Sequence, residues 1–513
     1  MKNNVFKTFL LTLLVIVALL GLFFVPRLQI GDTLLRRVNI LSDIQQRDST
    51  GRILAEVKAD SLEGIVEEQL DLEAVQVEDI NYQDSIPDGM TAIEDFASTD
   101  GLVREMDKFY RALDEASVRS VRIAYFGDSF IEGDILTADL RNMFQTRYGG
   151  NGVGWVDITS ISEGFRQTVL HSHGGWAEHN ANDGKGKAFN SELQSIAGHY
   201  YLPARTGSLS LRGQSRVYGD KLQSADRAII YFSEGDNLSL TVRLNDGETQ
   251  TLRGSGTMPD NPEPAYDIVY QPTDSIDEIT GETIMTPVRV KKDVPVQTSD
   301  AGAEATVEAE ELNGPVMKLD MKAHGSGRFY AVSLEGHTGI TLDNHSMRGG
   351  NGWYLSTVPE RTMQRFAQLR PYDLIIIHYG LNVASPKSKD YKYYTDRLAP
   401  AVRLLQKCYP QASILIVGVS DRDQRSSDGQ LHTMAGICEL NSYQRRLASD
   451  QHIAFWNLYE AMGGDGSMAR MKEEKQANLD YTHINFAGGR HIAQIFFDVL
   501  MNGKENYDHR HGK

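Results

Sequence analysis

Residues 121–133, VRIAYFGDSFIEG, form the stretch that decides the fold. Six mostly apolar residues are followed at once by Gly-Asp-Ser, the pattern of a buried parallel strand that delivers a side chain to the edge of a sheet. Ser129 is therefore the first candidate for a catalytic nucleophile. A serine hydroxyl needs a base to take its proton and donors to stabilise an oxyanion. Gly-Asp-Ser alone also fits a strand-ending turn, so the remaining sequence must supply those groups.

Glycine and asparagine follow two further strand-like segments. Residues 340–344 (ITLDN) lead to Gly349 and Gly350 within SMRGGNGW. Residues 373–379 (DLIIIHY) are the clearest strand of the chain and end in Gly-Leu-Asn, which places Asn382 just beyond the strand. Because ligands bind at the carboxyl ends of the strands in open α/β sheets, these residues are candidates for oxyanion donors.

An Asp-x-x-His pair stands near the C-terminus. The segment LDYTHINFAGG places Asp480 three residues before His483, just ahead of a helical segment. Alone, the pair fits a helix cap and a surface histidine. After Ser129 and Asn382 it offers the acid and the base of a catalytic triad.

This ordered set resembles the four sequence blocks of the SGNH, or GDSL-type, hydrolase superfamily. The resemblance implies a serine esterase with a catalytic triad and an oxyanion hole, and it implies no cofactor. Matched position by position, it implies the nucleophile Ser129, the orienting acid Asp480, the base His483, and oxyanion donors from Ser129, Asn382 and Gly349, with Gly350 as the alternative glycine.

Helical and strand-like segments alternate on both sides of a long interruption. Residues 135–148 are helical after the serine, and the alternation resumes after residue 339 with strands at 413–419 and 453–458. This pattern predicts a doubly wound, flavodoxin-like α/β fold with a parallel five-stranded sheet. Between these parts, short β-like runs separated by turn residues predict an inserted β-sandwich.

The predicted organisation has six segments. They are a signal anchor or transmembrane helix (1–26), an acidic linker (27–97), the first part of the hydrolase domain (98–164), the inserted β-sandwich (165–338), the second part of the hydrolase domain (339–503) and a C-terminal tail (504–513).

The N-terminus carries an uncharged apolar run of seventeen residues, 9–25, after Lys2 and Lys7. It is short for a membrane span and also suits the core of a signal peptide, but no small-x-small cleavage site follows it. We expect an uncleaved anchor, with the catalytic part on the periplasmic or extracytoplasmic side. Arg27, Arg36 and Arg37 balance the two lysines, so this orientation follows from the family resemblance rather than from charge.

Acidic residues dominate the segment after the anchor. Residues 54–96 hold thirteen Asp or Glu against the single basic Lys58, which is most of the chain's net charge of −17. Such a segment predicts a solvated tether, with a docking arm for a basic partner as the alternative. No basic patch stands out, so we expect no nucleic-acid partner.

Cysteine and histidine give little sign of a metal. Cys408 and Cys438 allow at most one disulfide and form no Cys-x-x-Cys. His171, His173 and His179 invite interpretation as ligands, but no carboxylate or cysteine stands at a matching spacing. A polar loop is the preferred interpretation, and we expect no metal.

A narrower resemblance is carried by GDSFIEGDILTADLRNMFQTRYGGNGVGWV, by AMGGDGSM at residues 461–468 and by the β insertion. These features look like exported peptidoglycan O-acetylesterases, whose insertion resembles a carbohydrate-binding jelly roll. The resemblance implies removal of acetyl groups from a cell-wall or extracellular O-acetylated polysaccharide. Phe130 and Val383 depart from the residues common in those relatives and leave the substrate open. A polysaccharide O-acetyltransferase and a non-catalytic polysaccharide-binding protein are the alternatives.

Overall fold

The structure is a computed structural model that describes residues 84–97, 103–183, 189–235, 237–254, 306–425 and 429–512. It also gives the backbone of two strand pairs, β1 (Gln29–Ile30) with β2 (Thr33–Leu34) and β11 (Tyr266–Ile276) with β12 (Thr283–Lys291). The chain divides into two compact units, Met1–Ala74 and Val75–Lys513. All further description concerns the second unit.

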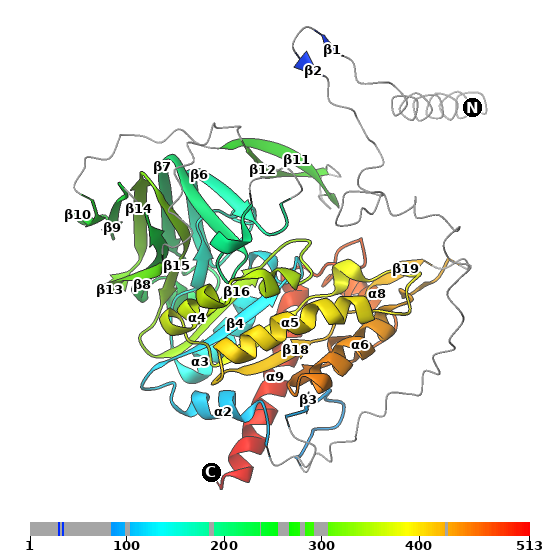
Figure 1. Cartoon of the computed structure of the whole chain (residues 1–513). Coiled ribbons are helices and arrows are strands. Elements are labelled where there is room, and N and C mark those ends of the chain that lie inside the picture. The colour runs from blue at the N-terminus through cyan, green and yellow to red at the C-terminus, as the bar shows by residue number, and fades with distance from the viewer. Residues whose placement is uncertain are drawn as a thin grey trace. The chain divides into compact units, whose positions relative to one another are not determined.

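A six-stranded sheet forms the centre of this unit (Figure 1). Its order is β16 (Gly339–Ser346), β4 (Ser120–Gly127), β17 (Leu374–His378), β18 (Ser413–Val417), β21 (Ala454–Trp456) and β3 (Ile93–Asp95). The first five strands are parallel, and in chain order they run 2-1-3-4-5. This confirms the predicted flavodoxin-like sheet, with its topological switch point between β4 and β17.

The sixth strand corrects the predicted linker. Strand β3 pairs antiparallel with β21, so part of the segment assigned to residues 27–97 belongs to the central sheet. Strand β3 is only three residues long and shows no alternation of apolar and polar residues, so the sequence pattern does not predict a strand there. It becomes an edge strand because it pairs with β21.

Helices cover both faces of the central sheet. Helices α2 (Asp107–Asp114), α3 (Thr137–Tyr148) and α9 (Phe486–Arg510) pack on one face, and α4 (Glu360–Leu369), α5 (Lys392–Cys408) and α6 (Ile437–Asp450) pack on the other. Strand β4 shows why both faces are apolar. Ile123 and Tyr125 belong to the first core, whereas Ala124 and Phe126 belong to the second.

The C-terminal end also differs from the prediction. Helix α9 continues to Arg510, so the expected tail at 504–513 is mostly the end of a long helix. Tyr507 is buried and Lys504 pairs with Asp114, the last residue of α2, which fixes this last part on the domain.

The insertion forms two groups of antiparallel strands. One group runs β6-β7-β14-β9-β10 and the other β5-β15-β8-β13, and between β7 and β15 only Tyr201 pairs with Phe329. The two groups enclose one apolar core, as a β-sandwich requires. The strands are β5 (Gly154–Asp157), β6 (Val169–Asn180), β7 (His199–Gly213), β8 (Ala225–Glu234), β9 (Ser239–Leu244), β10 (Thr249–Arg253), β13 (Val307–Val316), β14 (Lys318–His324) and β15 (Gly327–Glu335).

The insertion begins earlier than residue 165. Strand β5, placed by the sequence in the hydrolase domain, pairs with β15 of the insertion. Gly154 has a φ of +71°, and a Cβ there would lie 2.4 Å from Oδ1 of Asp343. Only glycine fits this close passage, which explains the glycine-rich GGNGVGW segment.

A buried ion-pair cluster ties the insertion to the central sheet. The guanidinium of Arg370, at the end of α4, donates to Asp343 of β16 at 2.5 and 2.7 Å and to Glu335 of β15 at 2.8 Å. All three side chains are fully buried. Burial alone raises the pKa of Glu335, but Arg370 and Arg122 outweigh it and hold that pKa below its usual range.

The predicted anchor at residues 1–26 lies outside the described residues. Within the described part of the chain, no helix is long and apolar enough to cross a membrane.

Candidate active site

Ser129, His483 and Asp480 meet at the carboxyl end of the central sheet. Ser129 follows β4, and its Oγ lies 3.1 Å from Nε2 of His483. The Nδ1 of the same imidazole lies 2.6 Å from Oδ2 of Asp480. The structure therefore brings the three predicted triad residues together in the order of nucleophile, base and orienting acid.

A short turn before α9 presents the acid and the base. Oδ1 of Asp480 accepts hydrogen bonds from the backbone N–H groups of Thr482 and His483, each at 3.0 Å. Asn485 then caps α9 by accepting from the amides of Ala487 and Gly488. The turn fixes the carboxylate, so the imidazole is aligned before any substrate arrives.

The charges of the triad favour a protonated histidine. The hydrogen bond to Asp480 raises the pKa of His483 above its usual 6.5, against the effect of partial burial. Burial raises the pKa of Asp480, but the hydrogen bonds from the His483 imidazole and from two backbone amides outweigh it and lower this pKa to about 2. Asp480 thus stays ionised and stabilises the imidazolium that forms when Ser129 gives up its proton.

The predicted oxyanion donors lie beside the serine loop. Asn382 stands in a short 3-10 turn after β17, and Gly380 before it has a φ of +130°. The backbone N–H of Gly350 donates to the carbonyl of Met347 at 2.8 Å. The N–H of Gly349, by contrast, donates to no backbone carbonyl among the described residues. This geometry favours Gly349 over Gly350 as the backbone donor.

Asp128 is a site residue that the sequence reasoning missed. Its Oδ1 accepts from the amide of Phe130 at 3.0 Å, and its Oδ2 accepts from Nδ2 of Asn382 at 2.7 Å. The other hydrogen of the Asn382 amide goes to the carbonyl of Gly350 at 2.9 Å. Asp128 therefore shapes the serine turn and holds the oxyanion asparagine, although its place inside Gly-Asp-Ser was its only signal.

Burial raises the pKa of Asp128 to about 6, against the hydrogen bond from the Phe130 amide and the nearby His483. In this structure the Asn382 amide is engaged by Asp128 and Gly350, so one of its hydrogens must turn toward a substrate oxygen before Asn382 can act as an oxyanion donor.

A polar cleft of about 260 Å³ opens between the hydrolase part and the insertion, and Arg348 in its lining is close enough to the triad to act on the pKa of His483. Arg348, directly before Gly349, forms one side of it and donates to Oε2 of Glu132 at 2.8 Å. Carboxylates and amides line the other side, namely Asp157, Glu178, Asn180, Asn182 and Asp183. No local sequence signal predicts this cleft, because its walls come from segments far apart in the chain.

Comparisons with known proteins agree with this architecture. No protein-family model and no curated protein sequence matches the chain. The solved structure of a peptidoglycan O-acetylesterase superposes with a TM-score of 0.57 at 20% identity, covering 80% of this chain and 99% of the other. Two further structures align over much smaller parts of the chain and add no argument. An acetyl xylan esterase aligns at 16% identity over 31% of this chain and 80% of the other, with a TM-score of 0.24. Est24, a carbohydrate acetylesterase from Sinorhizobium meliloti, aligns at 14% identity over 31% of this chain and 77% of the other, with a TM-score of 0.22.

The site combines a serine after the first strand of a 2-1-3-4-5 sheet, an asparagine after the third strand and an Asp-x-x-His pair before the last helix. This combination is that of a hydrolase with a serine nucleophile. The chain has the fold of the superposed peptidoglycan O-acetylesterase, whose solved structure aligns over most of both chains.

The pH dependence of ester hydrolysis tests the triad. His483 must be neutral to act as a base, and its pKa is raised, so we expect kcat/KM for a small acetyl ester to rise with pH through a midpoint above about 6.5. Asp480→Asn removes the partner that raises this pKa. We expect the midpoint to fall and kcat to drop by about 10³ to 10⁴.

The matched control is Asp450→Asn, an exposed carboxylate that pairs with Arg446 on α6. It should leave both the midpoint and kcat unchanged. A midpoint that stays the same in Asp480→Asn would show that Asp480 does not set the protonation of His483.

Proposed function

We propose that the protein is an SGNH acetylesterase that removes O-acetyl groups from peptidoglycan or a related extracellular polysaccharide. The observation that carries the proposal is the aligned Ser129–His483–Asp480 triad beside a polar cleft walled by the β-sandwich. The superposed peptidoglycan O-acetylesterase has the same fold over nearly its whole length, which supports the choice of substrate class.

The mechanism follows from the positions of the side chains. His483 takes the proton of Ser129 as the Oγ attacks the ester carbonyl, and the Asp480 carboxylate stabilises the resulting imidazolium. The amides of Ser129 and Gly349 and the Asn382 side chain hold the tetrahedral oxyanion. The imidazolium then protonates the leaving sugar oxygen, which leaves an acetyl-serine. Water, activated by the same histidine, releases acetate.

The cleft suits a sugar chain better than an apolar acyl chain. Its carboxylates and amides are acceptors and donors for hydroxyl groups, and Arg348 places a positive charge on the side nearest the triad. An acetyl group on such a chain is small enough to enter the serine turn while the sugars remain in the cleft. The substrate is therefore proposed to bind across the boundary between the hydrolase part and the insertion.

Acetate release tests the proposed reaction. We expect the purified protein to release acetate from O-acetylated peptidoglycan and from a small acetyl ester, and Ser129→Ala to abolish both with the fold intact by circular dichroism. Activity of Ser129→Ala near that of the parent protein would contradict the assignment. Hydrolysis of the small ester without release from the polymer would favour the acetyltransferase, and inactivity on both would favour the binding protein.

A bulky side chain in the cleft tests where the polymer binds. Asn182 is exposed and donates to the carbonyl of Arg348 across the cleft. We expect Asn182→Trp to lower kcat/KM for the polymer by about tenfold or more, and that for the small ester by much less, because only the polymer needs the filled space.

The control is Asn313→Trp on the exposed face of β13, which adds the same bulk away from the cleft. Equal losses on the polymer and the small ester in Asn182→Trp would place the sugar chain elsewhere.

We further propose that residues 9–25 remain attached as a membrane anchor and hold the esterase on the extracytoplasmic side. The support is the apolar run without a cleavage site and the acidic segment that follows it. Sequencing of the mature protein from membranes should find the run intact. A mature N-terminus that begins after Val25 would show a cleaved signal peptide instead.

A further inference from the structure

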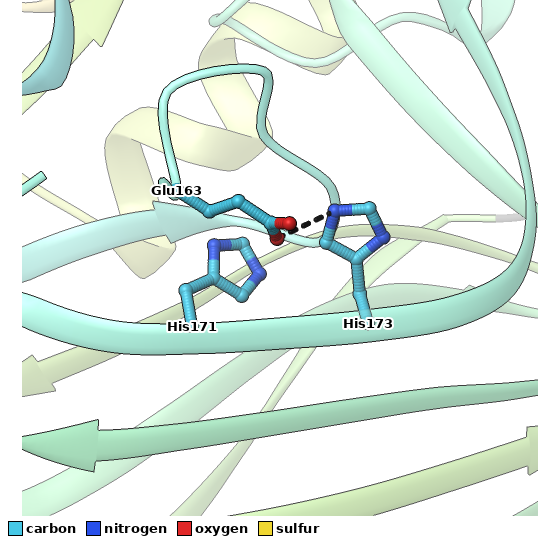
Figure 2. A group of neighbouring side chains, drawn as sticks. All are labelled: Glu163, His171 and His173. Atoms are coloured by element: carbon cyan, nitrogen blue, oxygen red, sulfur yellow. Dashed lines mark ion pairs between the residues drawn. The ribbon is translucent and has the colours of Figure 1, made fainter. Parts of the chain in front are cut away.

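Two histidines and a glutamate converge on the insertion, outside the catalytic site. Glu163, His171 and His173 each offer one ligand atom, and these atoms all lie within 4.8 Å of one another (Figure 2). Nε2 of His173 is 3.0 Å from Oε2 of Glu163. From the sequence, His171, His173 and His179 invite interpretation as ligands without a matching carboxylate, and the carboxylate that the structure supplies, Glu163, lies eight residues before His171.

Local structure explains the convergence. His171 and His173 are two positions apart on β6, so their side chains leave the same face of the strand. Glu163 comes from the segment between β5 and β6 and reaches back over that face, as Figure 2 shows. Arg166 of the same segment donates to the buried Asp134 of the hydrolase part, which holds the base of the segment in place.

The contacts of His173 fit a deprotonated ligand nitrogen. Its Nε2 receives the backbone N–H of Ser160 at 3.3 Å and also faces Oε2 of Glu163 at 3.0 Å. One ring nitrogen carries either a proton or a lone pair, so the imidazole alone cannot satisfy both contacts. A cation between the two side chains would take the lone pair of Nε2 in place of the long contact with the Ser160 N–H, and the Glu163 carboxylate would be its second ligand.

We propose that Glu163, His171 and His173 bind a divalent transition-metal ion of the zinc class. Two imidazoles and a carboxylate are a ligand set that Zn²⁺ takes, with a water molecule in the fourth position. Ligand atoms about 2.0 to 2.1 Å from a tetrahedral zinc lie about 3.3 Å from each other, so the group needs a contraction of at most about 1.5 Å.

Burial and access are both suitable for such an ion. The side chain of His173 is 2% exposed and that of Glu163 is 11% exposed. The histidines are therefore fixed within the sheet, while the carboxylate leaves a path from solvent.

The ion would act on the wall of the cleft rather than on the ester. Ser160 and Ser162, on the segment that carries Glu163, line the polar cleft beside the triad. A metal that links Glu163 to β6 fastens this segment to the sandwich. We therefore assign the site a structural role, and the assignment does not rest on the proposed esterase activity.

Metal content measures the site directly. Full-length protein without a histidine tag, stripped with a chelator and incubated with Zn²⁺ alone, should retain about one zinc per chain after gel filtration. His509 and His511 near the C-terminus could bind zinc on their own, so the parent for all variants is His509→Gln with His511→Gln. Co²⁺ in place of zinc should give the visible bands of a tetrahedral ion.

Matched variants locate the ion. We expect Glu163→Gln and His173→Gln to weaken zinc binding by at least about 10- to 100-fold. His324→Gln, an exposed histidine on β14 of the same sandwich, should bind zinc like the parent. Circular dichroism in the presence of chelator should be the same for all variants, which separates lost ligands from lost folding.

Three outcomes overturn the proposal. They are no zinc retained at about 100 μM Zn²⁺, equal zinc content in the parent and in both ligand variants, or an octahedral Co²⁺ spectrum that the variants share. Any of these would leave Glu163 and His173 as an ordinary ion pair between a loop and a strand.

Discussion

The ion-pair cluster around Arg370 is the constraint on which the two-part architecture depends. One buried guanidinium is shared by Asp343 of the parallel sheet and Glu335 of the sandwich, and Arg122 and Arg227 also reach Glu335. Loss of one member of a buried pair typically costs about 3 to 5 kcal/mol, because a charge is left unpaired in a dry interior. Only three residues separate β15 from β16, so the cluster fixes the sandwich beside the strand that leads to Gly349.

The active site depends on the sheet topology in a different way. At the switch point between β4 and β17, the chain leaves the sheet in opposite directions, and the two loops place Ser129 and Asn382 side by side. Asp128 connects these loops through a hydrogen bond. The acid and the base arrive separately on the turn before α9, so the nucleophile and its base are held by different parts of one compact unit.

The insertion contributes most of the residues that line the polar cleft. The central sheet, in contrast, positions Ser129, Asn382 and the turn that carries His483. The segment between β5 and β6 contributes residues that line the cleft, and it carries Glu163, which faces His171 and His173 of β6. This segment of about ten residues thus carries both lining residues of the cleft and one member of the Glu163–His171–His173 group.

The sequence by itself predicted where the parallel strands lie in the chain and which residues form the candidate triad, because long apolar runs and short motifs are local signals. It did not reveal strand β3, the reach of α9, the early start of the sandwich at β5, or the pairing of Asp128 with Asn382. Each of these depends on a partner that lies far away in the chain. The carboxylate beside His171 and His173 was missed for the same reason: a ligand set is defined by distances in space, and only the folded chain brings Glu163 within reach of the two histidines.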